Sequence, residues 1–159
     1  VTDAPGVPLM MRFGDCTPIL LFDPVRQAIG LTHAGWRGVV AGVVGGSIRT
    51  MTDHFGCLPG DIWAGIGPTI GPCCYEVGTD VAEAIASACP PGSRVIHPMN
   101  DRVHADLPAA VEAQLRAVGV EQIEHADLCT SCRVDEFFSH RAEDGETGRF
   151  GVVIGLEHG

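Results

Sequence analysis

The sequence predicts a mixed α+β (α/β) fold, because short apolar segments of strand length alternate with three stretches of helical periodicity. The chain has 159 residues, of which 45% are hydrophobic and 19% are charged. This is enough to bury a core, and we expect a single catalytic domain over residues 1–159. The 21 glycines and 11 prolines indicate many turns. We therefore expect a loop-rich, layered sandwich of β-sheets flanked by about three helices.

Apolar segments of four to eight residues mark the strands. Residues 9–22 are apolar on both sides of Gly14-Asp15-Cys16, which predicts two strands joined at that turn. Residues 28–32 predict a short buried strand that ends immediately before His33. Further strands are expected at residues 61–66, 93–96, 123–128 and 150–156.

Three segments have the spacing of a helix with one apolar face. The first covers residues 38–54 and ends at Gly56, which is typical of a helix C-terminus. The second covers residues 80–88, with Thr79 as the predicted N-cap. The third runs from its cap at Asp106 to residue 118, with Pro108 in the first turn.

Charge and cysteine content exclude several classes of protein. The net charge of −10 argues against binding to nucleic acid or to an anionic membrane, since both need a basic face. No apolar run reaches the ~18 residues that a membrane span requires. Seven cysteines, an odd number with Cys73 and Cys74 adjacent, do not form a secreted disulfide pattern, which predicts a cytoplasmic protein. The chain starts at Val1 within a loop-like stretch, and we expect an N-terminal segment to precede it.

A thiol and an imidazole stand at the ends of two neighbouring predicted strands. Cys16 precedes one strand and His33 follows the next. Because neighbouring strands lie about 4.8 Å apart, we expect the two side chains to share one pocket. The pair is either part of a zinc site or a nucleophile with its base. Asp15 is a candidate for orienting a ligand, and packing without function is the alternative for all three.

The remaining nucleophile and thiol patterns are weaker. Cys129-Thr130-Ser131-Cys132 is a single Cys-x-x-Cys without a second one or a histidine pair, so we interpret its thiols as packed or surface groups. Cys73 and Cys74 are interpreted as loop packing. Ser47 and Ser139 lack the context of a serine nucleophile.

Three arginines are candidates for holding an anion. Arg37 opens the first predicted helix, where free N–H groups favour negative charge. Arg141 and Arg149 flank the polar loop near the C-terminus, and guanidinium groups can bind phosphate through two hydrogen bonds. Surface ion pairs with the 20 acidic residues are the alternative. Gly67, in a glycine- and proline-rich loop, either lines a substrate site or makes a tight turn at a strand end.

Several motifs, in order along almost the whole chain, resemble one bacterial family. They are Asp15-Cys16-Thr17-Pro18, His33-Ala34-Gly35-Trp36-Arg37-Gly38, the loop from Gly65 to Gly78, Leu128-Cys129-Thr130, Phe137-Phe138-Ser139-His140-Arg141 and Thr147-Gly148-Arg149. The set is similar to the laccase-domain proteins. These were first described as multicopper polyphenol oxidases and are now regarded mainly as purine nucleoside phosphorylases.

The resemblance implies a fold related to cytotoxic-necrotizing-factor-like cysteine–histidine proteins, with zinc bound by one cysteine and two histidines. The cysteine corresponds to Cys16 and one histidine to His33, while the other belongs to a segment upstream of Val1. His140 stands where the family usually has tyrosine. The implied activity is phosphorolysis of adenosine, inosine, guanosine and methylthioadenosine, with deamination of adenosine. Purine nucleosides and phosphate are thus the expected partners.

Three alternatives stay open. A copper-dependent polyphenol oxidase needs several histidines close together, whereas none of the seven histidines here forms a His-x-His pair. A cysteine hydrolase would use Cys16 as nucleophile and His33 as base. A metal-free homologue would act as a scaffold. The sequence indicates neither the preferred nucleoside nor the oligomeric state.

Overall fold

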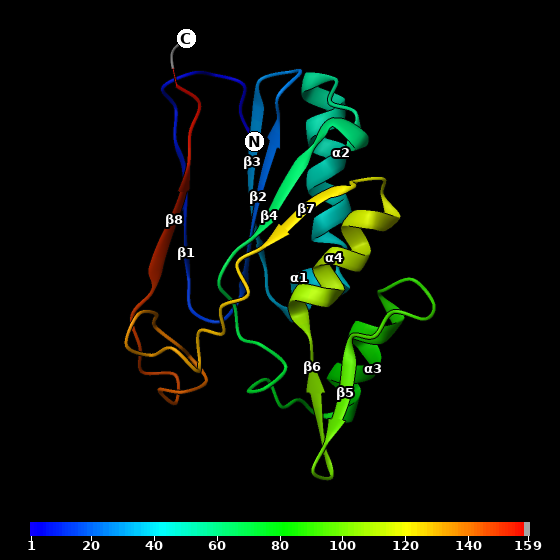
Figure 1. Ribbon diagram of the computed structural model, residues 1–159, viewed down its shortest axis with the longest axis vertical. Helices are drawn as coiled ribbons and strands as arrows, with labels where there is room; N and C mark the ends of the chain where they lie inside the picture. Colours follow the sequence, from blue (N-terminus) through cyan, green and yellow to red (C-terminus); the bar gives the residue numbers. More distant parts are fainter. Residues whose placement is uncertain (158–159) are drawn as a thin grey trace.

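The central element of the fold is a four-stranded sheet. The structure is a computed structural model that describes residues 1–157. The sheet contains β2 (Thr17–Asp23), β3 (Ala28–Ala34), β4 (Trp63–Ile66) and β7 (Gln122–His125), in the order β3-β2-β4-β7. β2 is antiparallel to β3 and β4, whereas β4 and β7 are parallel (Figure 1). The loops that leave β4 and β7 therefore start side by side at the same end of the sheet.

Two smaller sheets complete the β-structure of the described residues. β1 (Leu9–Phe13) pairs with β8 (Phe150–Ile154) in an antiparallel ribbon beside the central sheet (Figure 1). β5 (Ile96–Met99) and β6 (Arg102–Ala105) form a hairpin next to α3 (Thr79–Ser87). The two residues of the hairpin turn have positive φ angles of 48° and 62°, as a type I′ turn requires.

The first predicted helix is two helices. α1 (Trp36–Val40) and α2 (Val43–Phe55) are separated at Gly42, which has a φ of 75°. Only glycine adopts this left-handed conformation without strain, so the helix is interrupted there. This break is why the described residues form four α-helices rather than the predicted three. Gly56 ends α2 with a φ of 67°, as expected.

The other helix boundaries agree in part with the sequence patterns. α4 (Leu107–Ala117) begins as predicted, and the Asp106 side chain accepts a hydrogen bond of 2.9 Å from the Ala109 N–H. The predicted cap at Thr79 is wrong, because the N-cap of α3 is Gly78 and Thr79 is the first helical residue. The hairpin of β5 and β6 replaces the single strand predicted at residues 93–96.

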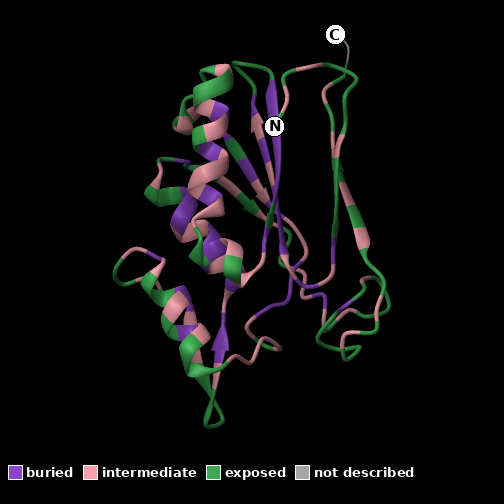
Figure 2. Cartoon of the chain, turned by 180° about the vertical axis from the view of Figure 1, so that it is seen from behind, coloured by how far each residue is buried: buried purple, intermediate pink, exposed green. Residues whose placement is uncertain are grey.

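The core lies between one face of the central sheet and α2 and α4. Buried residues recur along both helices and along the central strands (Figure 2). They include Val44, Ile48 and Met51 of α2, and Leu107, Val111 and Leu115 of α4, packed against Ile19, Leu21 and Ile66. Burial of such side chains contributes roughly 25 cal/mol per Å² of apolar surface. The fold is thus a mixed α+β arrangement of several small sheets and four helices.

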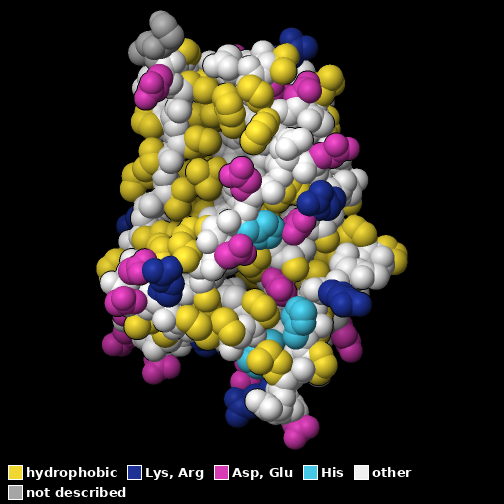
Figure 3. Space-filling model, in the orientation of Figure 1, with side chains coloured by type: hydrophobic (Ala, Val, Ile, Leu, Met, Phe, Trp, Pro, Cys, Tyr) yellow, Lys and Arg dark blue, Asp and Glu magenta, His cyan; other side chains and the backbone are white. Residues whose placement is uncertain are grey.

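The opposite face of the central sheet stays partly open. A hollow of about 140 Å³ there is lined by Leu20, Phe22, Trp63, Ala64, Gly65, Glu124 and Ile154. Figure 3 shows hydrophobic side chains gathered between β8 and the central sheet. Strand alternation explains this pattern, since Ile19 and Leu21 face the helices while Leu20 and Phe22 face away. None of the helices described is long and apolar enough to cross a bilayer.

Candidate active site

Cys16 and His33 lie at the same end of the antiparallel pair β2–β3. Thr17 pairs with Ala34, and Pro18 pairs with His33. Cys16 therefore stands opposite Gly35, and a Cβ atom on Gly35 would lie only 2.9 Å from Cys16 Sγ. The sulfur occupies the space that a side chain at residue 35 would fill. The predicted placement at neighbouring strand ends is what the structure has, with His33 as the penultimate residue of β3 rather than beyond its end.

The His33 ring packs against Phe13 and is otherwise exposed to solvent. It stacks on the buried ring of Phe13, with centroids 4.6 Å apart and an angle of 27° between the planes. His33 itself is exposed. Partial burial and the positive charge of Arg149 lower the pKa of His33. The ring is therefore neutral at physiological pH, and neutral imidazole is the form that binds a metal.

The Cys16 thiol is in an environment that disfavours the thiolate. Burial raises the pKa of Cys16, and the negative charge of Asp15 raises it further, while Arg149 lowers it. Without a metal, the side chain is therefore mainly a neutral thiol near pH 7. A bound cation would reverse this balance, because a coordinated thiol is deprotonated.

Asp15 connects three segments around Cys16. Its carboxylate accepts hydrogen bonds from Thr130 Oγ1 at 2.7 Å and from the Arg141 backbone N–H at 2.6 Å. Its backbone carbonyl accepts bonds from Thr69 Oγ1 at 2.7 Å and from the Ile70 N–H at 3.0 Å. Asp15 is buried and has a φ of 79°, a conformation that Asp tolerates better than most residues. It therefore fastens the turn before β2 to the loops that follow β4 and β7.

Arg149 and Arg141 come from the C-terminal part of the chain. Arg149 lies against the turn before Cys16, since a Cβ on Gly14 would be 3.0 Å from Arg149 Cδ. It is close enough to lower the pKa of both Cys16 and His33. The Arg141 guanidinium lies 5.2 Å from the centre of the Tyr75 ring and donates a hydrogen bond to the Glu76 carbonyl.

Arg37 lies at the start of α1, as predicted. Its guanidinium stacks over the Trp36 ring at 4.4 Å. α1 has only five residues, however, so its dipole is smaller than that of the long helix expected from the sequence. An anion at this position would be held mainly by the guanidinium charge.

Tyr75 is a site residue that the sequence analysis missed. Burial raises the pKa of Tyr75, and the charges of Arg141, Cys16, Asp15 and Arg37 also act on it. Its hydroxyl therefore stays protonated at neutral pH, and its ring lies beside the Arg141 guanidinium. Tyr75 is the single tyrosine of the chain and lies in the glycine- and proline-rich loop after β4. These two features of the sequence could have pointed to it.

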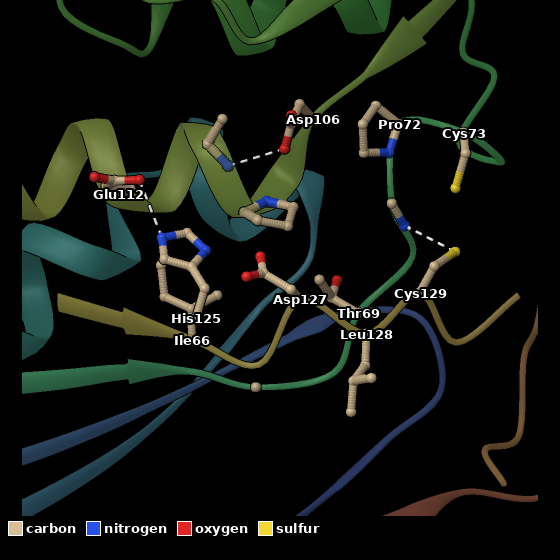
Figure 4. Close-up of a pocket in the computed structure, with 14 residues that line it drawn as sticks. Ile66, Thr69, Pro72, Cys73, Asp106, Glu112, His125, Asp127, Leu128 and Cys129 are labelled. Carbon is tan, nitrogen blue, oxygen red and sulfur yellow. Dashed lines mark hydrogen bonds and ion pairs between the residues drawn. The ribbon is translucent and has the colours of Figure 1, made fainter. Parts of the chain in front are cut away.

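Gly67 lines a separate cavity of about 430 Å³ next to α4 (Figure 4). Of the site residues predicted from the sequence, all of which the structure describes, it alone lines this cavity. A Cβ on Gly67 would lie 3.1 Å from Pro18 Cγ, so glycine is needed for close packing at the exit of β4. The cavity walls also carry Glu112 and His125, which are 3.0 Å apart.

Four cysteines come together beside this cavity. The Sγ atoms of Cys73, Cys74, Cys129 and Cys132 all lie within 4.8 Å of one another, an arrangement that could hold a metal ion. Cys74 Sγ is 3.3 Å from Cys132 Sγ, and Cys73 Sγ is 3.6 Å from it. The sequence analysis treated the two pairs of thiols separately, whereas the structure brings them together. The second half of the cluster is an adjacent pair, not another Cys-x-x-Cys.

His140, at the position where the family usually has tyrosine, is part of the polar loop near the C-terminus. Its ring lies against Gly145 of the same loop, where a Cβ would be 3.2 Å from His140 Cε1.

Comparison with known proteins identifies the family. The family described as multi-copper polyphenol oxidoreductase laccase matches residues 1–157. The chain belongs to this laccase-domain family. It is 39% identical over 97% of its length to "Purine nucleoside phosphorylase YlmD" of Geobacillus stearothermophilus, and 35% identical over 98% to "Purine nucleoside phosphorylase YfiH" of Escherichia coli. A human protein, "Purine nucleoside phosphorylase LACC1", is 35% identical over 98% of the chain.

Solved structures of laccase-domain relatives have the same fold. The crystal structure of YlmD from Geobacillus stearothermophilus superposes with a TM-score of 0.94 at 38% identity, over 98% of this chain. That of the Bacillus licheniformis protein YfiH gives 0.93 at 36% identity, over 98% of this chain. The chain covers 59% and 60% of those two proteins, 58% of the curated YlmD, 62% of the Escherichia coli YfiH and 36% of human LACC1.

Proposed function

We propose that this chain forms the catalytic domain of a zinc-dependent purine nucleoside phosphorylase. Cys16 and His33 would be two of the three protein ligands of the metal. The third would be a histidine from a segment that this sequence does not contain. One observation carries the proposal: a thiol and a neutral imidazole lie at the same strand ends, and the Arg149 charge acts on both.

The residues present fit zinc on chemical grounds. Thiolate sulfur and imidazole nitrogen are standard zinc ligands, and a catalytic site keeps one coordination position free. The stack on Phe13 restrains the His33 ring, while its exposed edge stays accessible. A cation would also offset the burial and the Asp15 charge that now disfavour the Cys16 thiolate. When bound, zinc would supply Lewis-acid chemistry.

The arginines suit the second substrate, phosphate. Phosphorolysis forms a bond from a phosphate oxygen to C1′ of the ribose while the bond from C1′ to the purine breaks, and the purine leaves with a proton. Arg149, Arg141 and Arg37 would hold the phosphate against C1′, where positive charge builds up on the sugar. Tyr75 would offer a neutral O–H donor to the same space.

The names of the relatives support nucleosides as the substrate class. Within this proposal, adenosine, inosine, guanosine and methylthioadenosine are the expected substrates, and deamination of adenosine is the expected second activity. We also propose that the fold is related to that of the cytotoxic-necrotizing-factor-like cysteine–histidine proteins.

Copper-dependent oxidation of phenols is the second candidate, because the family's description names that activity. A cysteine hydrolase is less favoured, since the raised pKa of Cys16 works against a free nucleophilic thiolate. A scaffold without catalysis is the remaining outcome.

The test is phosphate-dependent release of hypoxanthine from inosine by the product of the complete reading frame that encodes this sequence. We expect turnover that needs both zinc and phosphate and that is lost in Cys16→Ser and in His33→Ala. Hypoxanthine release without phosphate would contradict phosphorolysis. Oxidation of a phenolic dye only after copper addition, without phosphorolysis, would favour the oxidase. No turnover and no metal at Cys16 would favour the scaffold.

A further inference from the structure

The four-cysteine cluster joins two loops that leave parallel strands. Cys73 and Cys74 lie in the loop after β4, and Cys129 and Cys132 in the loop after β7. The pairing of these strands continues beyond their ends, since the Thr69 N–H donates to the Leu128 carbonyl at 3.1 Å. The backbone thus brings the two cysteine pairs to the same place before any bond between sulfurs is formed.

The sulfur positions suit a tetrahedral metal ion. Zinc–thiolate bonds of about 2.3 Å place neighbouring sulfurs about 3.8 Å apart. The observed distances of 3.3 Å and 3.6 Å to Cys132 Sγ, and an upper limit of 4.8 Å for every pair, bracket that value. All four cysteines are free thiols, and the 3.3 Å between Cys74 Sγ and Cys132 Sγ is well beyond the ~2.05 Å of a disulfide bond.

The backbone around the sulfurs supports the same conclusion. The Gly71 N–H donates to Cys129 Sγ at 3.3 Å, and ligating groups are commonly held by such bonds. A Cβ on Gly71 would be 3.3 Å from Cys73 Sγ and 3.5 Å from Cys129 Cβ. The space occupied by the sulfurs therefore depends on glycine at residue 71. The Cys132 N–H donates to the Cys129 carbonyl at 3.2 Å, which turns both thiols to the same side.

We propose that Cys73, Cys74, Cys129 and Cys132 bind one zinc ion as a four-thiolate structural site, separate from Cys16 and His33. Four protein ligands leave no position for substrate, so the site is structural. On binding, Zn²⁺ replaces the protons of the thiols, and no oxidation or reduction takes place.

This site would stabilise the proposed catalytic region. Tyr75 directly follows Cys74, and Thr130, which follows Cys129, donates a hydrogen bond to the Asp15 carboxylate. Fastening the two loops to one ion would therefore fix the Tyr75 ring and the Asp15 contacts together.

The experiment measures zinc content and zinc-edge X-ray absorption of the complete reading-frame product, purified under reducing conditions. The His33→Ala variant is used to weaken the other proposed site, because His33 is exposed and its substitution leaves the core intact. In this variant we expect about one zinc per chain with four sulfur neighbours at about 2.3 Å. Adding Cys132→Ser should remove that signal. Adding Cys89→Ala, a cysteine outside the cluster, should leave it unchanged.

Three results would overturn the proposal. One is a protein without zinc in the His33→Ala background, including a reduced protein that takes up no added zinc. Another is a zinc shell containing nitrogen or oxygen that does not change in Cys132→Ser. Mass spectrometry that finds a Cys74–Cys132 disulfide in the protein as isolated without reductant, together with no zinc, would also count against it. Phosphorylase activity does not enter these readouts, so the site can fail or hold independently of the proposed function.

Discussion

Two sulfur-containing regions of this molecule differ in how they are built. Cys16 and His33 are placed by the strand register of one hairpin, because the pairing of β2 with β3 brings both residues to the same end. The four-cysteine cluster is placed by two loops whose cysteines are 58 and 59 residues apart in the pairs with the shortest contacts. The first region brings together one thiol and one imidazole, whereas the second brings together four thiols beside the cavity of about 430 Å³. Local strand pairing is enough for the first arrangement, whereas the second depends on how two long loops fold.

The largest expected effect is at Cys16. Cys16→Ser should lower kcat/KM for inosine by on the order of a thousandfold, because a catalytic metal supplies several kcal/mol of transition-state stabilisation. The four-sulfur zinc signal should persist in this variant. Steady-state assays and zinc-edge absorption on the same preparation check both statements, with Cys89→Ala as control. Equal loss of both signals would mean that the two regions form one site.

The next effect concerns stability. In the His33→Ala background, a zinc chelator should lower the free energy of unfolding by about 4 kcal/mol if free zinc exceeds its dissociation constant a thousandfold. This corresponds to a fall of roughly 8–16 °C in the unfolding midpoint. Adding Cys132→Ser should abolish the response to chelator. The unfolding midpoint is measured by thermal unfolding followed by circular dichroism. A chelator response that persists in the Cys132→Ser variant would contradict a structural role of the cluster.

Asp15 links the two regions, so its removal should affect both. Asp15→Ala leaves the Thr130 hydroxyl and the Arg141 N–H without their acceptor, which should cost roughly 2–3 kcal/mol of stability. Asp144→Ala is a matched control, since Asp144 also has a positive φ, of 49°, but is exposed. Urea unfolding of the two variants compares them. Equal destabilisation would assign the effect to backbone conformation instead of the carboxylate.

The smallest expected effect is electrostatic. Burial lowers the pKa of His33 most, and the Arg149 charge lowers it further. In metal-free protein, Arg149→Met should therefore raise the pKa of His33 toward its ordinary value. A His pKa below the unfolded value makes the folded state lose stability as pH falls below about 6.5. The variant should therefore be less sensitive to acid than the parent. NMR titration of the His33 ring tests this, with Arg116→Met, on α4, as the control.

The sequence predicted the local part of the fold well. The strand pair around Gly14-Asp15-Cys16, the cap at Asp106 and the end of α2 at Gly56 follow from apolar spacing and from residues with special backbone preferences. It failed at Gly42, because a glycine within an apolar helical pattern is compatible with either a continuous helix or a break. In the structure both helices pack against β3 and α4, and α1 also packs against α3.

The candidate site likewise has a part that local sequence predicts and a part that long-range contacts decide. Cys16, His33 and their strand-end position could be derived from the sequence, since adjacent antiparallel strands leave little choice of geometry. Tyr75 could not, because its place beside Arg141 depends on how a long irregular loop folds back. Asp15 was expected to orient a ligand. That role stays a prediction, and in the structure the carboxylate accepts hydrogen bonds from Thr130 and the Arg141 backbone, at sequence separations of 115 and 126.

By itself, the sequence determined most of the elements, the placement of Cys16 and His33 at neighbouring strand ends, and the family. Only the tertiary structure decided that Cys73-Cys74 and Cys129-x-x-Cys132 are one cluster and that three loops meet at Asp15. The physical reason is that local patterns record which backbone conformations and buried faces are favoured. Contacts between loops arise from the parallel pairing of β4 with β7, and no spacing along the chain specifies that pairing.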